Sequence, residues 1–247
     1  MTNFVNRAVT ALLLASSVVS CGARRQAQKN HSEIADTADV AAKASIDKKV
    51  IHRLTEEDYR EVAERLGVEV ATIKAVVEIE AGSAHQGFHK PGEPLINFDI
   101  SMFRKFAGRN GINLSKYNKS HAVVFSRPNA SRYGSTQAGQ QARLKAARTI
   151  DETTAIQGCF WGMFQIGGFN WKKCGCSSIR EFAERMAVSE REQLELFANF
   201  VTNTGMLQHL RSKNWSAFAR MYNGGSYASR GYHTRLANSY AKHSRKK

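Results

Sequence analysis

From residue 51 onward, apolar residues recur three or four positions apart, which is the period of a helix that buries one face. The first stripe consists of Tyr59, Val62, Ala63 and Leu66. Thr55 stands before this stripe with acidic residues just after it, and Gly67 follows the stripe; these are start and stop signals of a helix. The pattern therefore predicts a helical domain and excludes one built mainly from strands, whose side chains alternate with a period of two.

Similar spacing predicts further helices, and one region departs from it. The expected helices cover residues 70–80, begin at Ser189, follow Asn214, and begin at Tyr232. Between Gly82 and Gly139 the helical spacing breaks up, and residues 95–100 predict a short strand that forms half of a hairpin. We therefore expect an α+β fold that is predominantly helical, with a small strand-and-loop lobe inserted early.

Composition and charge narrow the class of partner. The chain has 247 residues, of which 42% are hydrophobic, so it can bury a large core and is not wholly disordered. Lys and Arg number 36 against 21 Asp and Glu, a net charge of +15. Only +3 of this charge lies in residues 1–50, so the main domain is itself basic. Such a domain is attracted to polyanions: nucleic acid, an anionic membrane or a bacterial cell wall.

The first 21 residues are typical of a bacterial export signal. Arg7 precedes an apolar stretch, Ala8 to Val19, that is too short to span a membrane. The small residues before Cys21 resemble a lipobox, in which the cysteine is acylated and becomes the mature N-terminus. The alternative is an ordinary signal cleaved near Ala23. We expect a signal peptide at 1–21, a linker at 22–50 and a catalytic domain at 51–247, exported as a membrane-anchored lipoprotein of the cell envelope.

Three further cysteines lie in the main domain. In an oxidising compartment, Cys159 is expected to pair with Cys174 or Cys176, which leaves one thiol free. A zinc site needs a fourth ligand, and no histidine stands at metal spacing to Cys174 and Cys176. No metal or cofactor is therefore expected.

Glu80 occupies an unusual position on the helix predicted at 70–80. At about 100° per residue it falls on the same stripe as Ile73, Val76 and Val77. Burial and the negative end of the helix dipole both disfavour an ionised carboxyl there. A carboxyl that stays protonated near neutral pH can act as a general acid at a glycosidic oxygen. The alternative is that the helix ends at the surface and Glu80 simply reaches water.

Two later segments complete a pattern. They contain Gly162 with Gln165 in one segment, and Tyr222 with Asn223 before Gly224 in the other. The segments that carry the pattern read LTEEDY at 54–59, AVVEIEAGS at 75–83, CFWGMFQIGGFN at 159–170 and FARMYNGGSYASRGYHTRL at 218–236. In this order they resemble the N-acetylmuramidase domain of phage endolysins and bacterial cell-wall hydrolases. That domain belongs to the lysozyme-like superfamily of lytic transglycosylases and goose-type lysozymes, and the resemblance implies a lysozyme-like fold from about Leu54 to Tyr240.

The resemblance also implies roles for individual residues. Glu80 matches the catalytic acid, Gln165 a residue that lines the cleft, and Tyr222 and Asn223 residues beside the sugar subsites. Two positions depart from the family pattern. Ala81 stands where the family usually has serine, and the residues Phe98-Asp99-Ile100-Ser101 replace a Phe-Glu-x-His pattern.

The expected substrate is peptidoglycan, cut between N-acetylmuramic acid and N-acetylglucosamine. A second carboxylate would stabilise the oxocarbenium-like transition state, and Asp99 is the first candidate, with Glu93 in reserve. Alternatively, the acylamino group of the substrate acts as nucleophile, and no second carboxylate is needed. A lytic transglycosylase with anhydro products is then an alternative to hydrolysis, and the sequence leaves the two open. A non-catalytic peptidoglycan-binding lipoprotein is the remaining alternative. Nucleic acid is not an expected partner, because no DNA- or RNA-binding motif is present. Oligomeric state, the membrane that holds the anchor and the origin of the target wall stay open.

Overall fold

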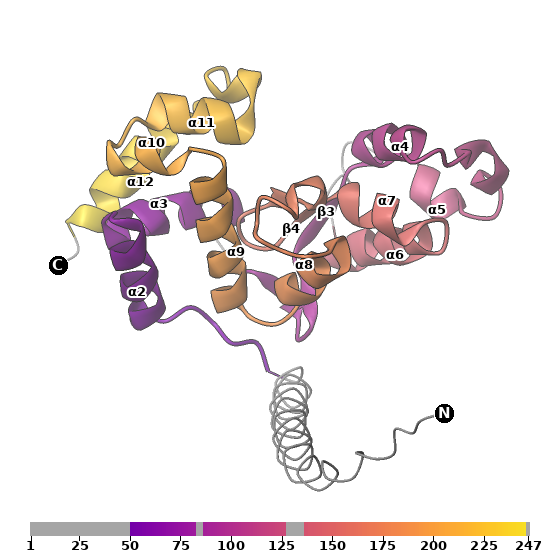
Figure 1. The fold of residues 1–247 in the computed structure, drawn as a ribbon, viewed down its shortest axis with the longest axis horizontal. Helices are drawn as coiled ribbons and strands as arrows, with labels where there is room; N and C mark the ends of the chain where they lie inside the picture. The colour runs from indigo at the N-terminus through magenta and orange to yellow at the C-terminus, as the bar shows by residue number, and fades with distance from the viewer. Residues whose placement is uncertain (1–49, 83–85, 127–135, 246–247) are drawn as a thin grey trace, which may run out of the picture. The chain divides into compact units, whose positions relative to one another are not determined.

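The computed structural model describes residues 50–82, 86–126 and 136–245 (Figure 1). These ranges belong to one unit, Lys48–Lys247. The predicted signal peptide, Cys21 and nearly all of the predicted linker lie outside the described residues. Within the described ranges, no helix is both long and apolar enough to cross a membrane.

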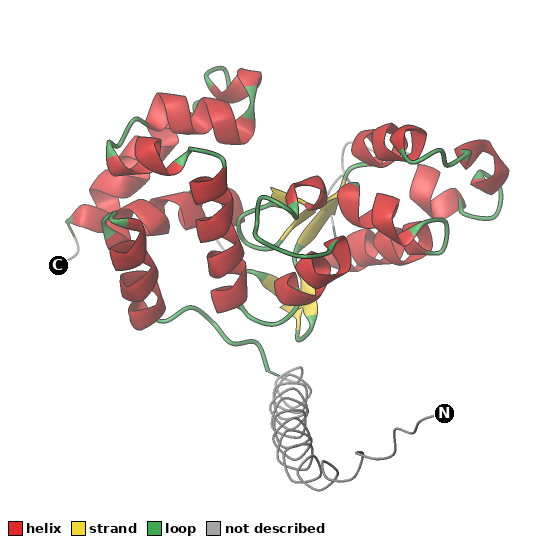
Figure 2. Ribbon diagram, in the orientation of Figure 1, coloured by secondary structure: helices red, strands yellow, loops and turns green. Residues whose placement is uncertain are grey.

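The described chain is predominantly helical with a few short strands, which confirms the predicted α+β class (Figure 2). In chain order the α-helices are α2 (Glu56–Leu66), α3 (Val70–Ala81), α4 (Ile100–Arg109), α5 (Ala122–Phe125), α6 (Gln137–Arg148), α7 (Glu152–Gln157), α8 (Ile179–Met186), α9 (Glu190–Asn203), α10 (Leu207–Arg211), α11 (Trp215–Asn223) and α12 (Tyr232–Ser244). Short 3-10 helices lie at Leu114–Tyr117, Gly168–Asn170 and Gly225–Tyr227.

The first helix begins and ends where its sequence predicts. The Thr55 side chain accepts a hydrogen bond from the Asp58 amide at 3.2 Å, and Asp58 accepts one from the Thr55 amide at 2.8 Å. Gly67 ends α2 with a φ of 63°, in the left-handed region that glycine adopts at little cost. The next helix, α3, packs against α2 and also against α12.

The strands form two small antiparallel sheets. One is the pair β1 (Phe88–Lys90) and β2 (Glu93–Pro94). The other has the order β3 (Ile96–Phe98), β4 (Cys159–Trp161) and β5 (Ile166–Gly167). In it Ile96 lies opposite Trp161, and Phe160 lies opposite Gly167.

The predicted strand at 95–100 is therefore real but shorter, and it is not half of a hairpin. It pairs with β4, which lies far along the chain. Asp99 ends the strand because its Oδ1 accepts hydrogen bonds from the amides of Ser101 and Met102, at 2.8 and 3.0 Å. This makes Asp99 the N-cap of α4, and Ile100 is already helical.

The expected strand-and-loop lobe between Gly82 and Gly139 is more helical than its sequence predicts. It contains α4 and α5, and α6 begins at Gln137. The buried face of α4 consists of Phe103, Phe106 and Ala107, which is too short a stripe to stand out among the basic residues around it. The disulfide prediction is also wrong: Cys159, Cys174 and Cys176 are buried free thiols. Burial, with the neighbouring Cys176, raises the pKa of Cys174 to about 12, so this group stays a thiol.

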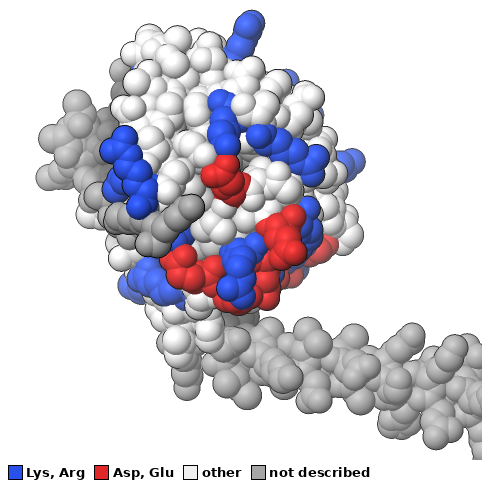
Figure 3. Space-filling view, turned by 90° about the vertical axis from the view of Figure 1, so that its left-hand side faces the viewer, with Lys and Arg blue, Asp and Glu red and all other residues white. Residues whose placement is uncertain are grey.

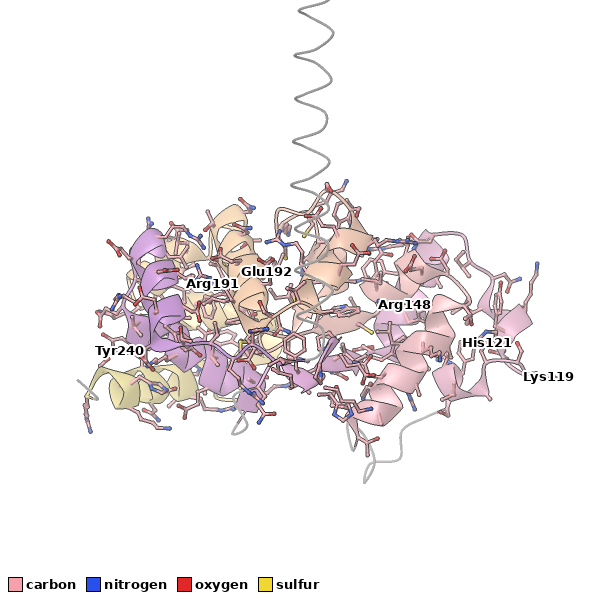
Figure 4. The ribbon with its side chains drawn as sticks, turned by 90° about the horizontal axis from the view of Figure 1, so that it is seen from below. Lys119, His121, Arg148, Arg191, Glu192 and Tyr240 are labelled. Carbon is pink, nitrogen blue, oxygen red and sulfur yellow. The ribbon has the colours of Figure 1, made fainter. Side chains whose placement is uncertain are left out.

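Most helices lie towards the two ends of the described unit, and α8 and α9 lie between these ends. Helices α2, α3, α10, α11 and α12 lie at the left in Figure 1, α4 to α7 lie at the right, and β3 and β4 lie between them. Arg191 of α9 binds Asp58 and Glu61 of α2, at 2.9 and 2.7 Å; it is labelled in Figure 4. On the face seen in Figure 3, acidic and basic side chains lie next to one another.

Candidate active site

Glu80 lies in the last turn of α3, and its side chain is partly buried. The amide Nδ2 of Asn223 donates a hydrogen bond to its Oε1 at 3.0 Å. Burial raises the pKa of the Glu80 carboxyl, while the Asn223 hydrogen bond and the positive charge of Arg235 act in the opposite direction and are smaller effects. The carboxyl therefore keeps its proton to a higher pH than an ordinary glutamate does.

Asn223 is the last residue of α11. Asn214 caps the start of this helix by accepting a hydrogen bond from the Ala217 amide at 3.0 Å, as predicted. Gly224 ends it with a φ of 78°, which turns the chain away directly after Asn223. Oδ1 of Asn223 is buried and has no hydrogen-bond partner among the described residues. A buried oxygen of this kind is available to accept a hydrogen bond from a ligand.

Tyr222 joins α11 to the loop between β4 and β5. Its hydroxyl donates to the carbonyl oxygen of Phe164 at 2.5 Å, and its ring stacks on Phe218 with centroids 5.2 Å apart. Burial raises the pKa of the Tyr222 phenol well above its ordinary value, and the negative charge of Glu80 adds to this. Tyr222 therefore stays a neutral hydrogen-bond donor and fixes the position of its neighbour Asn223.

Gln165 lies in the same loop in a conformation that is uncommon for residues other than glycine. Its φ is 47°, and Gly162 at the start of the turn has a φ of 68°. Nε2 of Gln165 donates to the Gly162 carbonyl at 2.8 Å, so the side chain closes its own turn. This gives Gln165 a defined place at the cleft wall instead of a freely moving side chain.

A buried glutamine on α9 supports this turn from behind. Oε1 of Gln193 accepts from the Met163 amide at 2.8 Å, and its Nε2 donates to the carbonyls of Gly87 and Met186 at 3.1 and 2.9 Å. Sequence reasoning missed this residue. The signal was present, because Gln193 lies next to Leu194 and four residues before Phe197, on the buried face of its helix.

The site residues predicted from the later segments come together. Gln165, Tyr222 and Asn223 line one cleft of about 730 Å³. Glu80 is linked to these three residues by its hydrogen bond with Asn223. Arg235 of α12, which acts on the Glu80 charge, was not singled out from the sequence, although it lies in the segment at 218–236.

The two candidates for a second carboxylate lie elsewhere. Asp99 caps α4, and Glu93 lies in β2 with an oxygen 3.9 Å from Nζ of Lys90. Among the described residues, neither carboxylate contacts Glu80 and neither lines the cleft. No group of three or more His, Cys, Asp or Glu side chains in the described ranges is placed to hold a metal ion.

Comparison with known proteins identifies the family of this chain. The family model described as N-acetylmuramidase matches residues 69–244, which include Glu80, Gln165, Tyr222 and Asn223. The chain belongs to the N-acetylmuramidase family. The crystal structure of the Burkholderia AP3 phage endolysin resembles this muramidase with a TM-score of 0.65 and 36% sequence identity, over 78% of this chain and 73% of the endolysin. No curated protein matches.

The family membership and the fold agree with each other. This muramidase is a glycosidase with a predominantly helical, lysozyme-like fold, and it is a peptidoglycan hydrolase.

Proposed function

We propose that Glu80 is the general acid that cleaves the β-1,4 bond between N-acetylmuramic acid and N-acetylglucosamine. The observation that carries this proposal is the partly buried carboxyl of Glu80, with a raised pKa, hydrogen-bonded to a residue of the cleft wall. A carboxylic acid of this kind gives its proton to the glycosidic oxygen as the bond to muramic C1 breaks and positive charge develops there.

Asn223 defines which oxygen carries the proton. Because its Nδ2 donates to Oε1 of Glu80, Oε1 acts as acceptor and the acidic proton resides on Oε2. The buried Oδ1 of Asn223 accepts a hydrogen bond from an N–H or O–H group of the sugar. After proton transfer, the Asn223 amide and the charge of Arg235 stabilise the new carboxylate.

The second half of the reaction has two possible routes. In the first, the acylamino oxygen of the muramic residue attacks C1; water or the sugar's own hydroxyl then completes hydrolysis or anhydro-ring formation. The position of Asp99 at a helix cap, away from the cleft wall, supports this route. In the second, Asp99 stabilises the charge at C1 through Oδ2, since its Oδ1 is the oxygen that accepts both cap hydrogen bonds.

Digestion of purified peptidoglycan, with mass analysis of the new ends, tests these assignments. We expect Glu80→Gln to lower kcat by roughly 10²- to 10⁴-fold, because the amide cannot donate a catalytic proton. Glu64→Gln is the matched control, since Glu64 is exposed on α2 and should turn over like the wild type. Undiminished turnover in Glu80→Gln would reject the general acid.

The same digestion separates the two routes. Reducing muramic ends indicate hydrolysis, and anhydro ends indicate transglycosylation. Asp99→Asn keeps a cap oxygen but removes the charge, so a large loss of kcat in that variant favours the second route. A wild-type chain that binds peptidoglycan without cutting it would instead support the binding-only alternative.

We also propose that the enzyme acts outside the cytoplasmic membrane, tethered through acylated Cys21. The support is the order of Arg7, the apolar stretch and Cys21 in the sequence, together with a substrate that lies outside this membrane. Acyl labelling of the wild type that disappears in Cys21→Ser is the expected result. Labelling that persists in the variant would contradict the anchor.

A further inference from the structure

A second recess continues the catalytic cleft. It has a volume of about 650 Å³, and its wall includes Trp171, Lys172 and the start of α8. The recess shares Phe169 and Lys173 with the wall of the cleft that holds Gln165. The cleft and the recess are therefore neighbours, so a polymeric ligand bound in one lies next to the other.

Aromatic rings lie where the cleft and the recess adjoin. Phe169 stacks on Phe106 with centroids 5.3 Å apart, and it meets Phe160 edge to face at 6.2 Å. Phe160 belongs to the cleft wall. Partly exposed rings held rigidly by one another provide an apolar platform for a ligand.

The charge of this groove is positive and is not neutralised by the protein. Lys172 and Lys173 are exposed, and no described carboxylate forms an ion pair with either of them. Neither the cleft nor the recess has an Asp or Glu among its described lining residues. Glu181 lies nearby, but its Oε2 already accepts hydrogen bonds from the amide and hydroxyl of Ser177, at 2.7 and 2.5 Å.

Some other lysines of the unit do have acidic partners. Ion pairs join Lys74 to Glu56 at 2.6 Å, Lys213 to Glu69 at 2.5 Å and Lys242 to Glu78 at 2.9 Å. The mixed red and blue surface in Figure 3 agrees with such pairing at that end of the unit. Lys172 lies over the ring of Trp171 at 5.2 Å, but neither it nor Lys173 has an acidic partner among the described residues, and two adjacent lysines of this kind in the recess favour an anionic ligand.

We propose that the recess binds carboxylates of the peptide chains that peptidoglycan carries on its muramic acid residues. This inference rests on the proposed function, because it takes the glycan in the cleft to be peptidoglycan. The lysines supply the charge, and Phe169 and Trp171 supply apolar contact for the peptide between the sugar and its carboxylates. The enzyme then distinguishes peptide-bearing glycan from bare glycan before any bond is cut.

Binding to insoluble cell wall tests the recess without turnover. The full-length chain with Glu80→Gln is sedimented with three preparations of peptidoglycan. One is untreated wall, and one is wall with its carboxylates coupled to methylamine. The third consists of the glycan strands that an amidase frees from their peptides, coupled to beads so that they sediment; these strands carry only lactyl carboxylates. We expect clearly weaker binding to both treated walls, and a difference from untreated wall that shrinks at high salt.

Two double variants in the same background locate the effect. Lys172→Met with Lys173→Met should raise the Kd for untreated wall by roughly three- to twentyfold, and should cause no further loss on the treated walls. Lys119→Met with Lys145→Met removes the same charge outside the groove, and should bind like its parent. In Figure 4, Lys119 lies at the far end of the unit from Tyr240.

Three results would overturn the proposal. The first is equal binding of the two double variants to untreated wall. The second is an equal loss for the Lys172 and Lys173 variant on all three walls. The third is full binding of the parent to amidase-treated wall, which assigns recognition to the lactyl group. Failure of the proposed function shows separately, as absence of cleavage by the chain that retains Glu80.

Discussion

Replacing Gln193 with leucine should remove much of the stability of this domain. The Gln193 side chain is fully buried, and its amide serves three backbone groups: the Met163 N–H and the carbonyls of Gly87 and Met186. Leucine is similar in size but offers no hydrogen bond. The substitution therefore leaves the Met163 N–H and the Met186 carbonyl without their partner, whereas the Gly87 carbonyl keeps the hydrogen bond from the Leu95 amide at 2.8 Å.

The size of the effect follows from that count. Each buried backbone group left unsatisfied costs about 1–3 kcal/mol. Leucine recovers roughly 1–3 kcal/mol because it is apolar and its own burial is favourable. With two groups left unsatisfied, we expect a net loss of about 2–3 kcal/mol in the free energy of unfolding, against a total of about 5–15 kcal/mol for a domain of ordinary stability.

Urea unfolding monitored by circular dichroism measures this loss. Gln208→Leu is the control, because Gln208 is exposed on α10 and should change the unfolding free energy by less than about 0.5 kcal/mol. Gln193→Glu should destabilise the domain at least as much as Gln193→Leu at neutral pH, since a buried carboxylate accepts from Met163 but loses its hydration and faces two carbonyls to which it cannot donate. If the free energy of unfolding of Gln193→Leu lies within about 1 kcal/mol of the wild-type value, the hydrogen bonds of Gln193 stabilise the domain less than we infer.

Three further predictions concern charge and backbone geometry. Arg235→Gln removes a positive charge that lowers the pKa of Glu80, so the alkaline limb of the kcat–pH profile should move to higher pH; an unmoved limb would contradict the assignment. Burial raises the pKa of Glu78, but hydrogen bonds from α12 outweigh this and hold it at about 2, below the ordinary 4.5. The ionised Glu78 therefore stabilises the fold fully at pH values above 4.5, and this stabilisation is lost as the pH falls toward 2. In urea unfolding, Glu78→Gln should lower the free energy of unfolding by about 1 kcal/mol at neutral pH and by little in acid. Gly162→Ala should lower the free energy of unfolding by about 2 kcal/mol or more in the same assay, because φ is 68° and the new Cβ would lie 2.7 Å from the buried Gln193 side chain. Gly225→Ala is the control and should change it little, because nothing lies within 4 Å of a Cβ there.

Features that depend on short stretches of chain could be predicted from the sequence. Thr55 and Gly67 identify the ends of α2 because capping is a local interaction. Glu80 could be placed on the buried stripe of α3 because helical angles follow from residue spacing alone. Its contact with Asn223 could be expected only from the resemblance, since the two residues lie on different helices.

Features that depend on distant segments could not be predicted. Phe98, Asp99 and Ile100 alternate in the manner of a strand, and the same residues suit a strand end followed by a capped helix. The strand is defined by its pairing with β4, which lies far along the chain beyond several helices. The same holds for Lys172, whose adjacency to the cleft depends on the path of the loop after Phe169.

Helix α12 covers the helix that carries Glu80, and it is translated long after that residue. Lys242 and His243 bind Glu78 at 2.9 and 2.7 Å, and Arg235 comes from the same late segment. A chain that ends before Tyr232 lacks Arg235, Lys242 and His243, so it loses the ion pairs of Glu78 and the positive charge that acts on Glu80. The surroundings of both glutamates on α3 are therefore complete only once the last described helix has packed against α3.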